Sequence, residues 1–113
     1  MDATDLISWA DFERVDMRVG RIVAVYPFPE AHKPAYRLKI DFGPMGVKNC
    51  SAQVTNYAPE ALQGRQVVAV VNFPPKQIGP AMSEVLVLGG VDADEKVCLL
   101  RPEPDCKLGS KVA

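Results

Sequence analysis

The sequence predicts an all-β domain in which five strands close into a small barrel, with short helices near the amino terminus and between strands 3 and 4. Three observations support this prediction. Residues 36–42 alternate between apolar and polar side chains, as expected of a strand with one buried face. Residues 66–73 are almost continuously apolar, which is typical of a strand buried on both faces. A short helical pattern at residues 59–62 separates the two.

The other elements follow from local signals. Ser8 and Asp11 have the spacing of a capping box, so a short helix should begin near Ser8. Residues 15–26 are rich in β-branched side chains and predict a long first strand, bent or bulged at Gly20. Further along, the sequence predicts a turn at 43–46, a third strand at 47–54, the helix at 59–62 with Pro59 in its first turn, a loop at 74–82, a strand at 84–88 and a short final strand at 97–100.

Three strands, a short helix and two more strands, with a long bent first strand, is the order expected of an OB barrel. Closing the sheet in this way removes most of its free edges. A small SH3-like barrel is the main alternative, and the position of the helix favours the OB fold. The whole chain, 1–113, is expected to be one OB domain with short N- and C-terminal extensions.

Composition narrows the classes of function. No apolar run approaches the ~20 residues that cross a bilayer, so no membrane insertion is expected and the chain is interpreted as cytoplasmic. Residues 17–90 hold eight Lys or Arg and four Asp or Glu, whereas the two ends hold five bases and ten acids. A basic centre can attract an anionic ligand although the net charge is -1. The alternative is that these side chains form an ordinary solvated surface.

Neither catalysis nor metal binding is expected. Cys50, Cys98 and Cys106 lack the close spacing of zinc or redox motifs, and His32 is the only histidine. No nucleophile and base stand in a recognisable pattern, so we expect no enzyme activity, no metal and no cofactor. The cysteines are interpreted as buried hydrophobes or idle thiols.

A ligand site is expected where OB folds bind ligands, on strands 2 and 3 between loops 1-2 and 4-5. Cationic and amide side chains in these parts suit phosphates and unpaired base edges. The candidate residues are Lys33, Arg37, Lys39, Lys48 with Asn49 as its alternative on the third strand, Ser51, Gln53, Asn72, Lys76 and Ser83. The alternative is that a half-exposed sheet simply turns its polar residues outward.

The same loops also carry apolar side chains, which suggests a second kind of ligand. Phe28, Ile78 and Met82 could line a shallow groove for extended apolar peptides. Phe28 could instead stack on a base. The sequence thus leaves two hypotheses open, a polypeptide-binding chaperone and an RNA-binding module.

Several segments together resemble a known family. Residues 12–20 resemble the opening of the tRNA-binding OB domains, which are appended to some methionyl- and tyrosyl-tRNA synthetases and also occur as free dimeric proteins. Residues 40–43, 51–55, 70–76, 83–90 and 109–112 resemble the CsaA-type, export-related chaperones of that family.

The resemblance implies an OB fold, a homodimer, no catalytic activity and a general affinity for tRNA. For the CsaA branch it also implies binding of unfolded or exported polypeptides in partnership with the secretion machinery. It assigns Lys76, Ser83 and Glu84 to the loop 4-5 signature of the tRNA-binding group, with Asn72 at the strand end before it. Val85 and Leu86 replace the Gly-Met of the synthetase-appended domains, and this departure favours the chaperone branch.

Two apolar clusters at the chain ends predict a homodimer independently of this resemblance. A small barrel cannot easily cover both clusters, and pairing two chains about a twofold axis would bury them. The alternative is that the terminal segments fold back onto their own barrel. The clusters are Leu6, Ile7, Trp9 and Phe12 at one end and Val97, Leu99 and Leu100 at the other.

Overall fold

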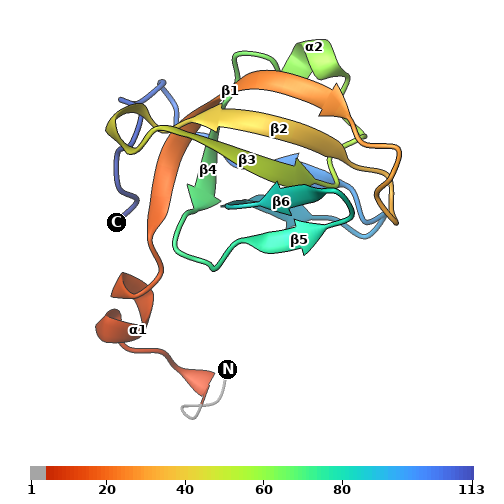
Figure 1. The fold of residues 1–113 in the computed structure, drawn as a ribbon. Coiled ribbons are helices and arrows are strands. Elements are labelled where there is room, and N and C mark those ends of the chain that lie inside the picture. The colour runs from red at the N-terminus through yellow and green to blue at the C-terminus, as the bar shows by residue number, and fades with distance from the viewer. Residues whose placement is uncertain (1–4) are drawn as a thin grey trace.

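Five antiparallel strands curl into a nearly closed barrel, which confirms the predicted all-β OB fold (Figure 1). The computed structural model describes residues 5–113. The strands lie in the order β3-β2-β1-β4-β7, and the segment that carries β6 and β7 returns beside β3. The elements are α1 (Trp9–Glu13), β1 (Met17–Pro27), β2 (Tyr36–Asp41), the 3-10 helix η2 (Gly43–Met45), β3 (Val47–Ala52), α2 (Pro59–Leu62), β4 (Gln66–Val70), β5 (Lys76–Ile78), β6 (Ala81–Ser83), β7 (Leu86–Val87), β8 (Gly89–Val91) and β9 (Val97–Leu99).

Strand β2 has the register that its alternating sequence predicts. Leu38 and Ile40 are buried in the core, whereas Arg37 and Lys39 are exposed on the outer face. A slip of one residue would exchange these two sets. The basic outer face of β2 is therefore confirmed.

Strand β1 is long and irregular, but the irregularity is not where the sequence suggested. Its pairing with β2 shifts between Ile22 and Ala24, beyond Gly20. Gly20 has another function in the fold, because a Cβ added there would lie 2.6 Å from Ile40 Cγ2 and 2.7 Å from Phe42 Cε1. The glycine leaves space for the fully buried Phe42 ring, so it serves core packing and not the bulge.

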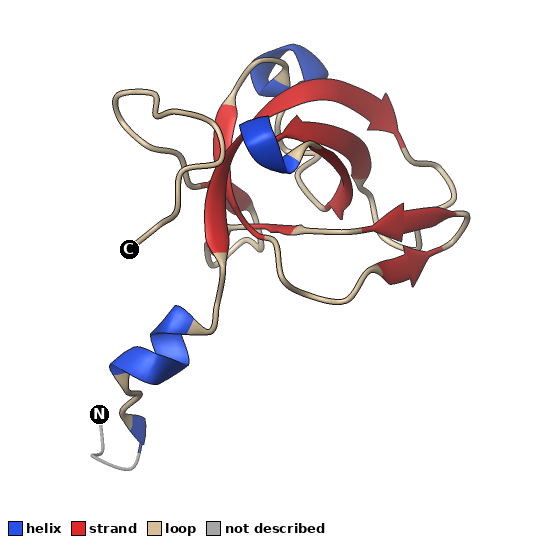
Figure 2. Cartoon of the chain, turned by 60° about the vertical axis from the view of Figure 1, so that its left-hand side comes forward, coloured by secondary structure: helices blue, strands red, loops and turns tan. Residues whose placement is uncertain are grey.

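Both short helices form as predicted. Ser8 Oγ accepts a hydrogen bond from the Asp11 backbone N–H, and Asp11 Oδ2 accepts one from the Ser8 N–H, which completes the capping box of α1. Helix α2 has Pro59 in its first turn and buries Leu62 in the barrel core. Figure 2 shows α1 standing away from the barrel, whereas α2 lies on it.

The C-terminal segment folds back onto its own barrel, which corrects part of the dimer argument. Leu99 is buried in the core and Val97 packs against it, so they are not free to form an interface cluster. Further on, the Gly109 N–H donates to Val19 O (2.8 Å) and the Val112 N–H donates to Met17 O (2.9 Å), so this segment lies beside the start of β1 and forms an isolated bridge with it. The N-terminal cluster remains exposed, with the Trp9 side chain 78% accessible. Residues 1–4 of the expected N-terminal extension lie outside the described residues.

Candidate functional site

The expected loop 74–82 contains a two-stranded hairpin, β5–β6, that lies against β3. Two side chains and one backbone N–H at the end of the hairpin bond to the backbone of β3, in place of a regular ladder of backbone hydrogen bonds. The Ser51 N–H donates to Ser83 Oγ (3.0 Å) and the Asn49 N–H donates to Glu84 Oε2 (2.7 Å). The Glu84 N–H donates in turn to Asn49 O (2.8 Å). Ser83 and Glu84, expected in a ligand site, thus close the seam between β3 and the hairpin and position what the hairpin carries.

The tip of the hairpin meets loop 1-2, and this contact corrects the interpretation of Phe28. The Phe28 ring is only 4% exposed, so it can neither stack on a base nor line an open groove. A methyl group added at Gly79 would lie 3.8 Å from Phe28 Cζ, which places the hairpin tip on the ring. The Arg37 guanidinium lies over the same ring at 5.8 Å from its centroid. Phe28 supports the site from beneath.

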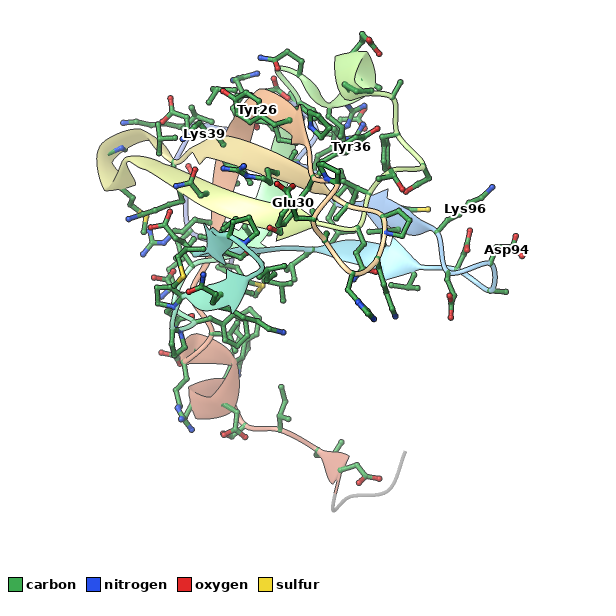
Figure 3. All side chains as sticks on the ribbon, turned by 45° about the vertical axis from the view of Figure 1, so that its right-hand side comes forward. Tyr26, Glu30, Tyr36, Lys39, Asp94 and Lys96 are labelled. Atoms are coloured by element: carbon green, nitrogen blue, oxygen red, sulfur yellow. The ribbon has the colours of Figure 1, made fainter. Side chains whose placement is uncertain are left out.

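Beside the hairpin, the outer face of β2 and β3 is polar and basic. Arg37 pairs with Ser51 and Lys39 with Asn49 across the two strands, and Lys39 Nζ donates to Asn49 Oδ1 (3.0 Å). These side chains and Met82 border a hollow of about 230 Å³. Figure 3 shows Lys39 on this face, far from Lys96 at the other end of the molecule.

Lys48 does not belong to this face, which corrects its assignment to the site. It pairs with the buried Ile40, and paired residues of an antiparallel sheet point to the same side. Lys48 therefore points to the inner side at the start of β3 and is half-buried. Asn49, its neighbour, takes the outer position.

A second hollow, of about 340 Å³, separates loop 1-2 from β5. We call it the basic hollow because the cations of its rim, Lys33 and Lys76, face a wall of amide and small side chains. It brings together four of the predicted ligand residues. Its lining includes His32, Lys33, Ser51, Gln53, Lys76 and Gln77.

A third hollow, of about 280 Å³, lies beside the hairpin and is mainly apolar. We call it the apolar hollow. Phe73 and Leu86, 53% and 49% exposed, open it to solvent. Its lining includes Phe73, Pro74, Lys76, Ile78, Val85 and Leu86.

Ile78 and Met82 do not form one groove, contrary to the expectation from sequence. Gln77 pairs with Met82 and Ile78 with Ala81, so Ile78 and Met82 point from opposite faces of the hairpin. Ile78 lines the apolar hollow, whereas Met82 borders the polar face. The sequence interpretation missed Phe73, because it was placed in the buried strand 66–73, and Leu86, because it was placed in the predicted strand 84–88 with no ligand role.

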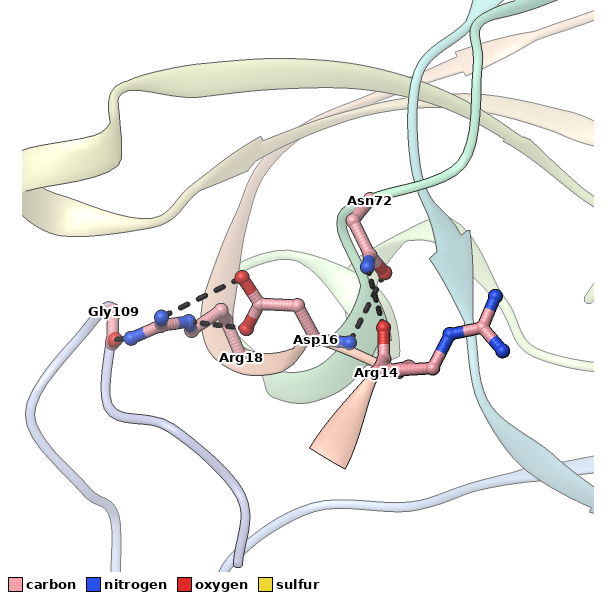
Figure 4. Close-up of polar contacts among 5 residues, drawn as sticks. All are labelled: Arg14, Asp16, Arg18, Asn72 and Gly109. Atoms are coloured by element: carbon pink, nitrogen blue, oxygen red, sulfur yellow. Dashed lines mark hydrogen bonds and ion pairs between the residues drawn. The ribbon is translucent and has the colours of Figure 1, made fainter. Parts of the chain in front are cut away.

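Asn72 has a bracing function outside these three hollows (Figure 4). Its Nδ2 donates to Arg14 O (2.7 Å), and its Oδ1 accepts from the Asp16 N–H (3.0 Å). Asp16 also forms an ion pair with Arg18 (2.7 Å), and Arg18 Nη1 donates to Gly109 O (3.2 Å). Asn72 thus connects the end of β4 to the segment between α1 and β1 and does not line the basic hollow.

The three cysteines differ in access. Cys98 and Cys106 are exposed, whereas Cys50 is buried on the inner side of β3. Burial raises the pKa of the Cys50 thiol from its ordinary value of 9.0 to about 11. Because the folded pKa lies above the unfolded one, the fold favours the protonated thiol. This contribution to stability is complete below pH 9.0 and is lost as the pH rises toward 11.

We therefore expect two thiols to react rapidly with a disulfide reagent at pH 8 and the third only after unfolding. Counting the released chromophore over time, with and without denaturant, measures this. A Cys98→Ser/Cys106→Ser double variant is the control and should show the slow thiol alone. Three rapid thiols in the native protein would contradict the burial of Cys50.

Within residues 5–113, no group of three or more His, Cys, Asp or Glu side chains is arranged to hold a metal ion. Over the same part of the chain, no helix is both long and apolar enough to cross a membrane.

The barrel has counterparts among known proteins. The family described as "Putative tRNA binding domain" matches residues 17–111. The methionine–tRNA ligase of Pyrococcus furiosus is 38% identical over 106 residues, which cover 94% of this chain but only 14% of the ligase. The chain therefore belongs to the tRNA-binding domain family, and it spans a small part of the curated enzymes that it matches.

Two solved structures narrow the comparison. The CsaA chaperone protein from Picrophilus torridus is 51% identical, with a TM-score of 0.91 over 96% of this chain and 100% of that one. The chaperone CsaA from Bacillus anthracis str. Ames is 48% identical, with a TM-score of 0.90 over 96% and 99% of the two chains. The likeness to CsaA-type members that the sequence motifs indicated is confirmed.

Proposed function

We propose that the chain is a CsaA-like chaperone that binds unfolded or exported polypeptides in the cytoplasm, without catalysis, and hands them to the secretion machinery. The observation that carries this proposal is the likeness to two CsaA chaperone structures over nearly the whole chain. We assign a capacity to bind tRNA to the same barrel, because the family that matches the chain is described as a tRNA-binding domain.

The apolar hollow supports binding of polypeptides. Phe73, Ile78 and Leu86 offer apolar contacts to side chains that an unfolded client exposes. Met82, 45% exposed on the other face of the hairpin, adds a flexible side chain that adapts to clients of varied shape. The apolar hollow and Met82 would therefore bind apolar segments of many different sequences.

Protection of a thermally unfolding protein against aggregation, followed by light scattering, tests this function. The wild-type chain should suppress scattering near equimolar ratio. Met82→Asp should lose more protection than Lys76→Ala, because a buried carboxylate opposes apolar contact, whereas alanine at 76 shortens one lining side chain without adding a charge. No protection by the wild-type chain would overturn the chaperone proposal, and equal losses would remove Met82 from the client surface.

The basic hollow and the outer face of β2 support the second activity, binding of tRNA. Lys33, Arg37, Lys39 and Lys76 are exposed cations on neighbouring elements. Phosphate contacts release counterions, so RNA affinity should fall steeply with salt, whereas apolar client binding should not. A pull-down from lysate, with and without nuclease, separates partners bound directly from partners held through RNA.

We also propose a homodimer, now supported by the N-terminal cluster alone. Leu6, Ile7 and Trp9 are strongly exposed, and a twofold pairing of α1 segments would cover them. Light scattering at micromolar concentration should give a mass near twice the 12.3 kDa of one chain. A mass near that of one chain would defeat the dimer.

A further inference from the structure

The apolar hollow and the basic hollow adjoin each other at the hairpin. Ser51, Lys76 and Ile78 line both of them. Two of these residues belong to the hairpin strand β5, which is three residues long and, among the strands of residues 5–113, pairs only with β6; we call this strand the wall. A single strand is about as wide as the ~4.8 Å spacing between neighbouring strands. Ligands in the two hollows would therefore lie in near contact.

Lys76 is the side chain for which the two ligands would compete directly. Its methylene stem can cover apolar surface, and its ammonium can reach for an anion. RNA phosphates in the basic hollow would draw the ammonium to that side. A polypeptide in the apolar hollow needs the stem as part of its wall.

The hairpin cannot readily serve both ligands by shifting as a whole. Ser83 and Glu84 hold it on β3 through bonds of 3.0 and 2.7 Å, and its tip rests on the buried Phe28 ring. Ser51, which both hollows share, is itself bonded to Ser83. The backbone of the wall is thus held in place, and the exposed Lys76 side chain can turn toward either hollow.

We propose that RNA and polypeptide exclude each other on this hairpin, so that bound RNA keeps the chain from holding a client and a client displaces RNA. This inference rests on the proposed function, and it adds a regulatory relation between its two ligands. The exclusion is reciprocal by thermodynamic linkage. With RNA at ten times its own dissociation constant, the apparent Kd for polypeptide should rise about 11-fold, since about one chain in eleven remains free of RNA.

The test is a fluorescence anisotropy titration of the full chain against a labelled, reduced and carboxymethylated unfolded protein, repeated with unlabelled bulk tRNA. The polypeptide is chosen to have an acidic net charge, so that it should not bind RNA by itself, which a titration without the chain checks. The expected result is an apparent Kd that rises in proportion to the RNA added. An unchanged Kd at saturating RNA, meaning a ternary complex, would overturn the exclusion.

Variants of residues that line only one of the two hollows test the exclusion more directly. Lys33 lines the basic hollow but not the apolar one, and Leu86 lines the apolar hollow but not the basic one. Lys33→Gln should leave the polypeptide Kd unchanged and require more RNA for the same displacement, whereas Leu86→Ser should weaken polypeptide binding and leave the RNA Kd unchanged. Lys76→Gln should lower the 11-fold effect at a matched ratio of RNA to its Kd, and an undiminished effect would contradict the role of Lys76.

The same titrations separate this inference from the proposed function. If the chain binds no polypeptide without RNA, or no RNA without polypeptide, the proposed function fails and the exclusion with it. If each ligand binds alone and both bind together without mutual effect, the exclusion alone is wrong.

Discussion

Phe42→Ala is expected to lower the free energy of unfolding by about 3–5 kcal/mol, the usual range for removing a buried aromatic ring from a core. Phe42 is fully buried, and Gly20 lies against its ring with no side chain of its own. Alanine would leave a cavity that the neighbouring strands cannot fill, since Gly20 supplies no atoms to collapse into it. Urea unfolding followed by circular dichroism measures the change through the midpoint at constant m-value.

Phe73→Ala is the matched control for this experiment. The same side chain is removed, but Phe73 is 53% exposed at the mouth of the apolar hollow. Its stability change should stay within about 1 kcal/mol, whereas protection of an aggregating client should weaken. A Phe42→Ala variant as stable as Phe73→Ala would contradict the packing at Gly20.

The double variant Arg37→Gln/Lys39→Gln is expected to weaken tRNA binding by on the order of tenfold to a hundredfold at low salt, because two exposed contacts between a cation and a phosphate, of about 1 kcal/mol each, are lost. The slope of log affinity against log salt should become shallower by about two, one for each phosphate contact. Both side chains point away from the core, so folding should be retained.

The control changes the same charge on another part of the surface. Lys96 and Arg101 are exposed and line none of the three hollows around the hairpin, and Figure 3 shows Lys96 far from Lys39. Lys96→Gln/Arg101→Gln should change the slope much less. Filter binding across four salt concentrations compares the two variants. Equal slopes in both would mean that net charge, and not the face of β2, governs RNA binding.

The strands with regular patterns were predictable from the sequence, because their side chains follow purely local rules. Alternation in β2 predicts which face is buried, and Arg37 and Lys39 fall on the expected side. The capping box of α1 is equally local, since Ser8 and Asp11 satisfy each other within one turn. These elements require no knowledge of distant contacts.

The site depended on contacts between distant segments, and there the predictions were less accurate. Phe28 stands in a proline-flanked loop that looks exposed, and its burial comes from a hairpin tip far along the chain. Lys48 and Asn49 could not be told apart from the sequence, and a difference of one position in a strand changes the face, so the choice of Lys48 was wrong and Asn49 is the outer residue. Phe73 was placed in a buried strand at 66–73, but β4 ends at Val70, and Leu86 lies in the short strand β7 yet is 49% exposed.

The seam between β3 and the hairpin also affects how the sequence of such a barrel can change during evolution. Between the end of β4 and the start of β7, the chain is fastened to β3 by Ser83 and Glu84, and its tip rests on Phe28. The pairings of β1 with β4 and of β4 with β7 lie outside this stretch. Insertions or exchanges at residues 76–81 would leave those strand registers intact, so the hairpin sequence can change while the barrel keeps its pairing. During evolution, a barrel of this kind can acquire a new ligand through substitutions in one short segment, while the core residues continue to be selected for stability.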